Sequence, residues 1–182
     1  LDNPTTVIFN DNDNAPAPID MAINFPFDDR IFTQCTINPN GWIGFENDDD
    51  NWDNTSLPSS QAPKSAIFGF WDDLNPVNDF CSSCSGEVYY HSNDERIVIW
   101  FNDVSHWPTY FDNSTYNFQM VLYKNGEIKF NYNLMNGDFS SATIGIQNSS
   151  GTSGLMMSFN TSYAENNLTT IISKAPSWVG IN

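Results

Sequence analysis

Carboxylate side chains are concentrated at two points of the chain where they could bind a cation. The pair Asp72 and Asp73 directly follows the apolar segment 66–71. The second point is a segment in which acids alternate with amides, and its acids are Glu46, Asp48, Asp49, Asp50 and Asp53. Calcium takes roughly six to eight oxygen ligands from a flexible loop. We therefore expect a calcium site built from Glu46, Asp48, Asp50 and Asp53, which Asp72 and Asp73 complete if the loop folds back over segment 66–71.

The acidic segment also has a plain alternative explanation. It lacks the glycine that an EF-hand loop carries at its sixth position, so it is not that motif. A solvated acidic loop without any ligand has the same composition. Asp11 and Asp13 form a second, weaker candidate for cation binding.

The three cysteines indicate an oxidising compartment. Cys81 and Cys84 belong to a Cys-Ser-Ser-Cys segment, whereas Cys35 lies in an alternating strand pattern. One such pair is too small for a closed zinc site, and neither the histidine of a haem-attachment motif nor the helix of a thioredoxin-type motif follows it. We predict a disulfide between Cys81 and Cys84, with Cys35 as a buried thiol. The alternative pairs Cys35 with one of the other two.

Aromatic residues in expected loops are candidates for ligand binding. Trp107, Tyr110 and Phe111 lie in one loop, and Trp52 lies in the acidic segment. Exposed rings beside amides and acids can stack on sugars or anchor a protein partner. We take Trp107 and Tyr110 as the candidate ligand-binding residues. The alternative is that these rings pack over the end of the fold.

The sequence contains no recognisable catalytic arrangement. Its two histidines, His91 and His106, are not near a nucleophile motif such as Gly-x-Ser-x-Gly. Acids are so plentiful that a pair at glycosidase spacing carries no information. We predict that the chain is not an enzyme.

The charge balance excludes one class of partner. The 182 residues include 22 Asp and Glu but only 6 Lys and Arg, which gives a formal net charge of −16. Phosphate binding needs clustered basic side chains, so we expect no nucleic-acid partner. We also expect no membrane span, because no apolar run is long enough, and no signal peptide is recognisable at the polar N-terminus.

Five Asn-x-Ser/Thr triplets would permit N-glycosylation in a host with the machinery. They begin at Asn54, Asn113, Asn148, Asn160 and Asn167. A chain this rich in Asn, Ser and Thr yields a similar number by chance, so the triplets do not themselves identify a glycoprotein.

Short alternating segments predict the elements that position these residues. A period of two runs through segments 19–27, 31–37, 42–45, 66–71, 87–91, 96–104, 118–122, 128–132, 142–147, 155–160 and 168–172. The pair Asn125-Gly126 predicts a hairpin with positive φ at both turn positions. About ten strands and no helical period predict one all-β domain over residues 19–182, an antiparallel β-sandwich or jelly roll.

Residues 1–18 are expected to form an extended N-terminal arm with one short strand at residues 6–9. Such a strand is not stable alone and must pair with a sheet edge. We expect it to pair with its own sandwich. The alternative is addition to the sheet of a neighbouring molecule, which would build a homo-oligomer or a filament.

Several motifs follow one another in an order that is shared with a known type of domain. They are Pro39-Asn40-Gly41-Trp42-Ile43-Gly44-Phe45, Ile67-Phe68-Gly69-Phe70-Trp71-Asp72-Asp73, Gly86-Glu87-Val88-Tyr89-Tyr90, Ile99-Trp100-Phe101-Asn102-Asp103-Val104, Phe118-Gln119 and Ile144-Gly145-Ile146-Gln147. This order resembles an extracellular β-sandwich module of large secreted and cell-surface bacterial proteins, often beside subtilisin-like proteases. It is also similar to the NIDO domain of nidogen-type extracellular proteins. The resemblance covers roughly residues 31–172 and carries no ligand site.

The resemblance implies a non-catalytic, extracellular or cell-surface module for adhesion or assembly, including assembly as a subunit of a surface filament. Its partner would be a protein or a surface glycan. The alternative function is that of a carbohydrate-binding accessory module of a secreted hydrolase. Loss of glycan binding in a Trp107→Ala variant would favour that alternative.

Overall fold

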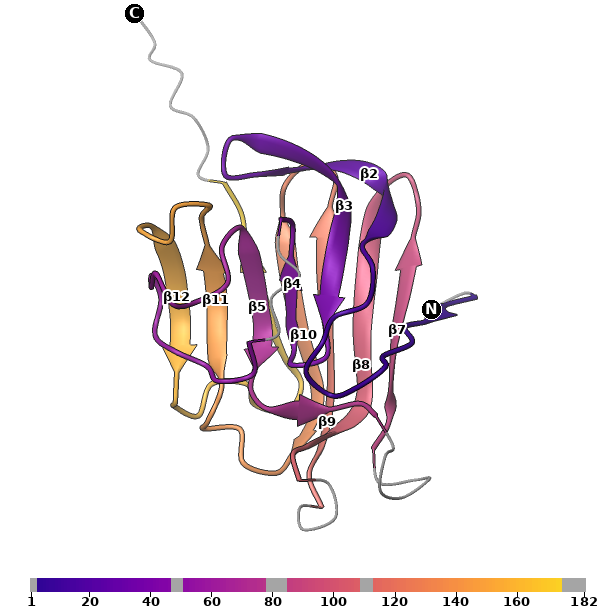
Figure 1. Ribbon diagram of the computed structural model, residues 1–182, viewed down its shortest axis with the longest axis vertical. Helices are drawn as coiled ribbons and strands as arrows, with labels where there is room; N and C mark the ends of the chain where they lie inside the picture. Colours follow the sequence, from indigo (N-terminus) through magenta and orange to yellow (C-terminus); the bar gives the residue numbers. More distant parts are fainter. Residues whose placement is uncertain (1–2, 47–50, 78–84, 109–112, 175–182) are drawn as a thin grey trace, which may run out of the picture.

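Two antiparallel sheets pack face to face in the computed structural model, which describes residues 3–46, 51–77, 85–108 and 113–174 (Figure 1). The seven-stranded sheet runs in the order β1 (Thr5–Thr6), β7 (Glu87–Ser92), β8 (Arg96–His106), β9 (Thr115–Tyr123), β10 (Ile128–Asn136) and β13 (Leu168–Ile172), with β6 (Leu74–Asn75) paired to β8. The six-stranded sheet runs in the order β12 (Gly154–Phe159), β11 (Thr143–Gln147), β5 (Ala66–Trp71), β4 (Trp42–Gly44), β3 (Arg30–Asn38) and β2 (Ile19–Phe27).

The expected β-sandwich is therefore confirmed, and each expected strand segment contains a strand. The two-residue strand β6 was not expected, because a strand this short has no period to detect. In the described part of the chain, no helical segment has the length and apolarity needed to cross a membrane.

The hairpin between β9 and β10 forms with a different turn from the expected one. Gly126 has a φ of 88°, but Asn125 does not have a positive φ. The amide of Gly126 donates to the carbonyl of Tyr123 at 2.9 Å, and the amide of Tyr123 donates to the carbonyl of Glu127. These bonds define a three-residue loop in which a turn over Lys124 and Asn125 is followed by a left-handed glycine.

The strand β5 is buried on both faces, as its uninterrupted apolar sequence predicts. All six of its residues are fully buried. Ile67 and Phe70 belong to the core between the sheets, whereas Phe68 and Trp71 belong to a second apolar cluster that includes Leu57 and Ala62. The segment that leads into β5 thus covers the outer face of the six-stranded sheet.

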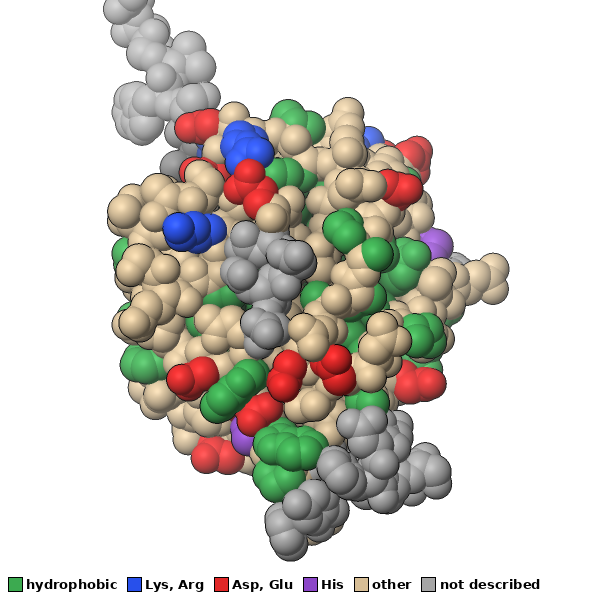
Figure 2. Space-filling view, viewed as in Figure 1, with side chains coloured by type: hydrophobic (Ala, Val, Ile, Leu, Met, Phe, Trp, Pro, Cys, Tyr) green, Lys and Arg blue, Asp and Glu red, His purple; other side chains and the backbone are tan. Residues whose placement is uncertain are grey.

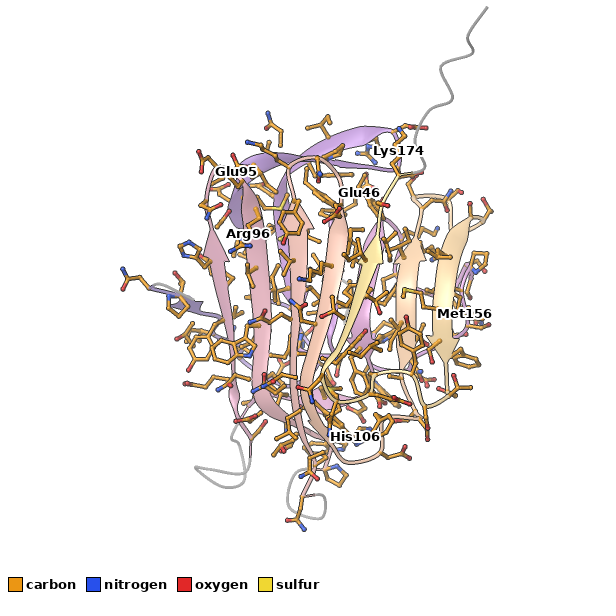
Figure 3. All side chains as sticks on the ribbon, turned by 180° about the vertical axis from the view of Figure 1, so that it is seen from behind. Glu46, Glu95, Arg96, His106, Met156 and Lys174 are labelled. Carbon is orange, nitrogen blue, oxygen red and sulfur yellow. The ribbon has the colours of Figure 1, made fainter. Side chains whose placement is uncertain are left out.

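The outer face of the seven-stranded sheet has a different character. Along β9, Phe118, Met120 and Leu122 are fully buried in the core, whereas Gln119 is half-buried on the opposite face. This alternation is typical of an antiparallel sheet with one solvated face. Figure 3 looks onto this face, with the other sheet behind β7, β8, β9 and β10.

The N-terminal arm joins its own sheet. Thr5 and Thr6 of β1 pair with Tyr90 and Tyr89 of β7. The amide of Val7 then donates to the carbonyl of Val88 at 2.8 Å, and the Val7 side chain is buried. The arm is thus the edge strand of the seven-stranded sheet rather than an extension separate from the sandwich.

Candidate functional site

Two carboxylates and a histidine meet at the end of the sandwich where β5 and β8 finish. Asp72 follows β5 directly, and its Oδ1 lies 3.3 Å from Nε2 of His106, the last residue of β8. The Ser141 hydroxyl donates to the other carboxylate oxygen of Asp72. Figure 3 shows His106 at this lower end, and Figure 2 shows several acidic side chains close together at the lower end of the opposite view.

Burial and the surrounding charges set the protonation states of His106 and Asp73. Burial lowers the pKa of His106, but the hydrogen bond and charge of Asp72 raise it more, so that the pKa is about 9. Burial raises the pKa of Asp73 to about 6; the charge of His106 opposes this rise, and the charges of Asp13, Asp72 and Asp53 add to it. At neutral pH, His106 is therefore an imidazolium ion paired with Asp72, and it is not available as a general base.

The Glu46 carboxylate lies at the opposite end of the sandwich and is already occupied. It forms a salt bridge with Arg30 and accepts a hydrogen bond from the Ser65 hydroxyl at 2.6 Å. Those hydrogen bonds lower the pKa of Glu46. Ser65 precedes β5 and Asp72 follows it, so a strand of six residues, roughly 20 Å long, separates the two carboxylates. Figure 3 labels Glu46 near the upper end and His106 near the lower end.

The expected calcium site is covered only in part, because its loop is not fully described. Glu46 lies at the other end of β5 from Asp72 and Asp73, so these two acids do not complete a site that includes Glu46. Asp53 is exposed, and its charge acts on Asp73, whereas Asp48 and Asp50 lie outside the described residues. Within the described ranges, no group of three or more Asp, Glu, His or Cys side chains is arranged to hold a metal ion.

The structure describes only one of the three cysteines. Cys35 is 1% exposed and carries a free thiol, whose pKa burial raises to about 12. A thiol in this state is inert as a nucleophile. Cys81 and Cys84 lie outside the described residues, and their disulfide stays a prediction.

The aromatic loop lies beside the acidic end. The amide of Trp107 donates to the carbonyl of Asp73 at 2.8 Å, and its ring is half-buried. Tyr110 and Phe111 lie outside the described residues, so the expected ligand-binding pair is not seen together. Trp52 is 49% exposed.

A groove on the outer face of the seven-stranded sheet was not recognised from the sequence. Its volume is about 420 Å³, which is within the range of about 300–1,000 Å³ typical of small-ligand sites. We call it the Trp100 groove, and its lining residues are Trp100, Asn117, Gln119, Asn131, Tyr132, Asn133, Asn167 and Thr169.

Hydrogen bonds between neighbouring strands organise the groove. The indole Nε1 of Trp100 donates to Oδ1 of Asn117 at 3.0 Å. The Thr169 hydroxyl donates to Oδ1 of Asn131 at 3.0 Å, and Nδ2 of Asn131 donates to Oε1 of Gln119 at 3.4 Å. Polar side chains from four strands are therefore linked in two short networks.

Irregular backbone on both sides of Asn117 shapes one end of the groove. A bulge in β8 places Asn102 and Asp103 opposite Asn117, and Nδ2 of Asn117 donates to both side chains at 3.0 Å. Asp103 has a φ of 56° at this bulge. A second bulge, in β10, lies between Tyr132 and Leu134. Bulges of this kind redirect side chains and are frequent beside binding sites.

The sequence contains a signal that would have identified this groove. The residues between the apolar positions of the expected strands form the outward face, and several of them are amides or aromatic residues. Reading those positions as a surface, rather than only as spacers in an alternating pattern, would have selected Trp100, Gln119 and Asn131.

A larger cavity, of about 620 Å³, lies at the other end of the sandwich. It is lined by the β2–β3 turn, the β9–β10 turn and the end of β13, with the exposed side chains of Ile31 and Leu155 at its surface. Its lining mixes apolar side chains with charged residues of both signs (Asp28, Asp29, Arg30 and Lys174) and does not specify a ligand.

The fold and these surfaces define an antiparallel β-sandwich with an aromatic and amide groove on its seven-stranded sheet. The chain belongs to the NIDO-related family, whose profile matches residues 1–178. The match includes the N-terminal arm and therefore extends beyond the expected range of residues 31–172. No curated protein and no solved structure matches the chain.

Proposed function

We propose that this chain is a non-catalytic extracellular module for adhesion or assembly at a cell surface. Membership of the NIDO-related family supports an extracellular setting. The observation that carries the binding role is the Trp100 groove, because a partly exposed tryptophan is held there by a buried amide on a solvated sheet face. Tryptophan residues fixed in this way frequently dominate binding energies.

The state of the most reactive groups supports a non-catalytic role. Both ring nitrogens of His106 are engaged, one with Asp72 and the other with the carbonyl of Trp107. Cys35 is buried with a pKa of about 12. These groups serve the fold rather than a reaction.

Assembly into a filament is the second form of this function, and the exposed edge strand β12 favours it. Leu155 and Met156 of β12 are 47% and 44% exposed. An edge strand with exposed apolar side chains offers backbone groups and contact area to another molecule. The arm is a less suitable connector than the sequence indicated, since β1 already pairs with β7 of the same chain.

Adhesion can be tested with beads coated with the protein and held under flow over immobilised matrix and cell-wall preparations. We expect retention on at least one surface and a loss of about tenfold or more in Trp100→Ala. Trp52→Ala is the matched control, because Trp52 is also partly exposed but lies outside the groove. Absence of retention on every surface, together with a monomer in analytical ultracentrifugation at high concentration, would contradict the proposal.

A further inference from the structure

We propose that the Trp100 groove binds a neutral oligosaccharide chain. This inference rests on the adhesion function proposed above and names its ligand class. The evidence is the composition of a single row of side chains, their hydrogen bonds and the charge around them.

One continuous row crosses the seven-stranded sheet through directly paired residues. Its members are Thr6, Tyr89, Trp100, Gln119, Asn131 and Thr169. The row contains no charged side chain, although the chain has 22 Asp and Glu. The part from Trp100 to Thr169 crosses three gaps between strands, roughly 14 Å. This length exceeds a single sugar ring and suits a short chain of them.

Two aromatic rings lie at one end of the row. The rings of Tyr89 and Trp100 have centroids 5.5 Å apart and are both half-buried. Their polar edges are engaged, since Trp100 donates to Asn117 and the Tyr89 hydroxyl donates to Glu87. Rings held in this way offer apolar surface of fixed orientation, which the C–H faces of sugars can cover.

The amides continue the row beyond the rings and supply hydrogen-bonding groups. The chain of bonds runs from Thr169 to Asn131 and from Asn131 to Gln119. It ends at Nε2 of Gln119, for which no described residue acts as an acceptor, and Gln119 is the strand partner of Trp100. An amide donor beside an aromatic ring matches a ligand that presents both hydroxyl groups and C–H faces.

The negative charge of the protein favours neutral over acidic glycans as ligands. Glu87 is bonded to Tyr89 of the row and Asp103 to Asn117 of the groove, and the whole chain carries a net charge of −16. Sulfated or uronic-acid chains would be repelled by this field. Five of the eight lining residues of the groove are amides, whereas the centres of protein interfaces are enriched in apolar contacts, so this composition favours a glycan over a protein partner.

An array of neutral and acidic oligosaccharides, followed by calorimetry of the strongest ligand, tests this proposal. We expect binding to neutral chains only, and a loss of about tenfold or more in both Trp100→Ala and Gln119→Ala. Gln119→Ala is the decisive variant, because it removes an outward amide without changing the core, and its thermal unfolding should match that of the wild type. Trp52→Ala should bind normally.

Three results would overturn the inference. They are binding to no neutral oligosaccharide, binding that survives in both groove variants, and binding lost instead in Trp107→Ala. In the bead experiment, periodate treatment oxidises the glycans of the surface. It therefore distinguishes failure of the glycan inference from failure of the proposed adhesion function. Retention that requires Trp100 but survives oxidation of glycans would leave adhesion standing and identify a protein ligand.

Discussion

The indole nitrogen of Trp100 donates a hydrogen bond to the side-chain oxygen of Asn117, 3.0 Å away on the neighbouring strand. Asn117 is only 9% exposed and lies between two bulges, one in β8 and one in β10. Its own Nδ2 is bonded to Asn102 and Asp103. Asn117 thus connects a surface tryptophan to the irregular backbone that shapes one end of the groove.

Replacement of Asn117 by Ala should lower the free energy of unfolding by about 1–3 kcal/mol, because it removes three hydrogen bonds at a nearly buried position. Urea denaturation measures this change. A double-mutant cycle with Trp100→Phe, which removes the indole donor and keeps a smaller aromatic ring, should give a coupling of about 1 kcal/mol. Strictly additive effects would mean that the bond does not position Trp100. Asn131→Ala, which removes two hydrogen bonds at a more exposed position on the same face, should cost less stability than Asn117→Ala.

The sequence predicted the strands well because their apolar positions alternate and their turns carry glycine, proline and asparagine. It did not show that Glu46 and Asp72 would be separated. The reason is topological: β4 and β5 are antiparallel neighbours, so the residues that follow them leave at opposite ends. The groove depends on the register of four strands and on two bulges, and neither follows from the alternation within any one strand.

Stability should depend on pH through His106. Its pKa of about 9 in the folded protein exceeds its ordinary value of 6.5, so the pairing with Asp72 stabilises the fold fully below pH 6.5. That contribution decreases as pH rises through 9 and amounts to about 3 kcal/mol at most. The difference in unfolding free energy between wild type and His106→Gln should therefore shrink between pH 6.5 and 9. A constant difference for His106→Gln across this range would refute the assignment.

Calcium binding by the segment that contains Asp48 and Asp50 remains a prediction. Millimolar calcium should raise the melting temperature and a chelator should lower it, since a ligand at a hundredfold excess over its Kd adds about 2.7 kcal/mol. The shift should disappear in the double variant Asp48→Asn with Asp50→Asn. It should persist in Asp72→Asn, because Asp72 is already paired with His106 and Ser141. No shift in the wild type would argue for a solvated acidic loop.

The thiol content should be one per chain in denatured, unreduced protein. That thiol is Cys35, which should not react in the native protein because it is buried with a pKa of about 12. Titration with a thiol reagent in guanidinium, before and after reduction, gives the count. Three thiols before reduction would exclude the Cys81–Cys84 disulfide. A peptide in which Cys35 is linked to either residue would establish the alternative pairing instead.

The N-terminal arm should stabilise its own domain rather than connect molecules. Val7 is 8% exposed and its amide bonds to Val88, whereas Ile8 beside it is 70% exposed. Val7→Ala should lower the free energy of unfolding by about 1–2 kcal/mol, since it removes two buried methyl groups, and Ile8→Ala should have almost no effect.

Deletion of residues 1–18 removes β1 and exposes the edge of β7, so the truncated protein should unfold more easily and self-associate more than the full chain. Sedimentation at high concentration decides between the two roles: polymers that form only when the arm is present would show that it pairs with neighbouring molecules.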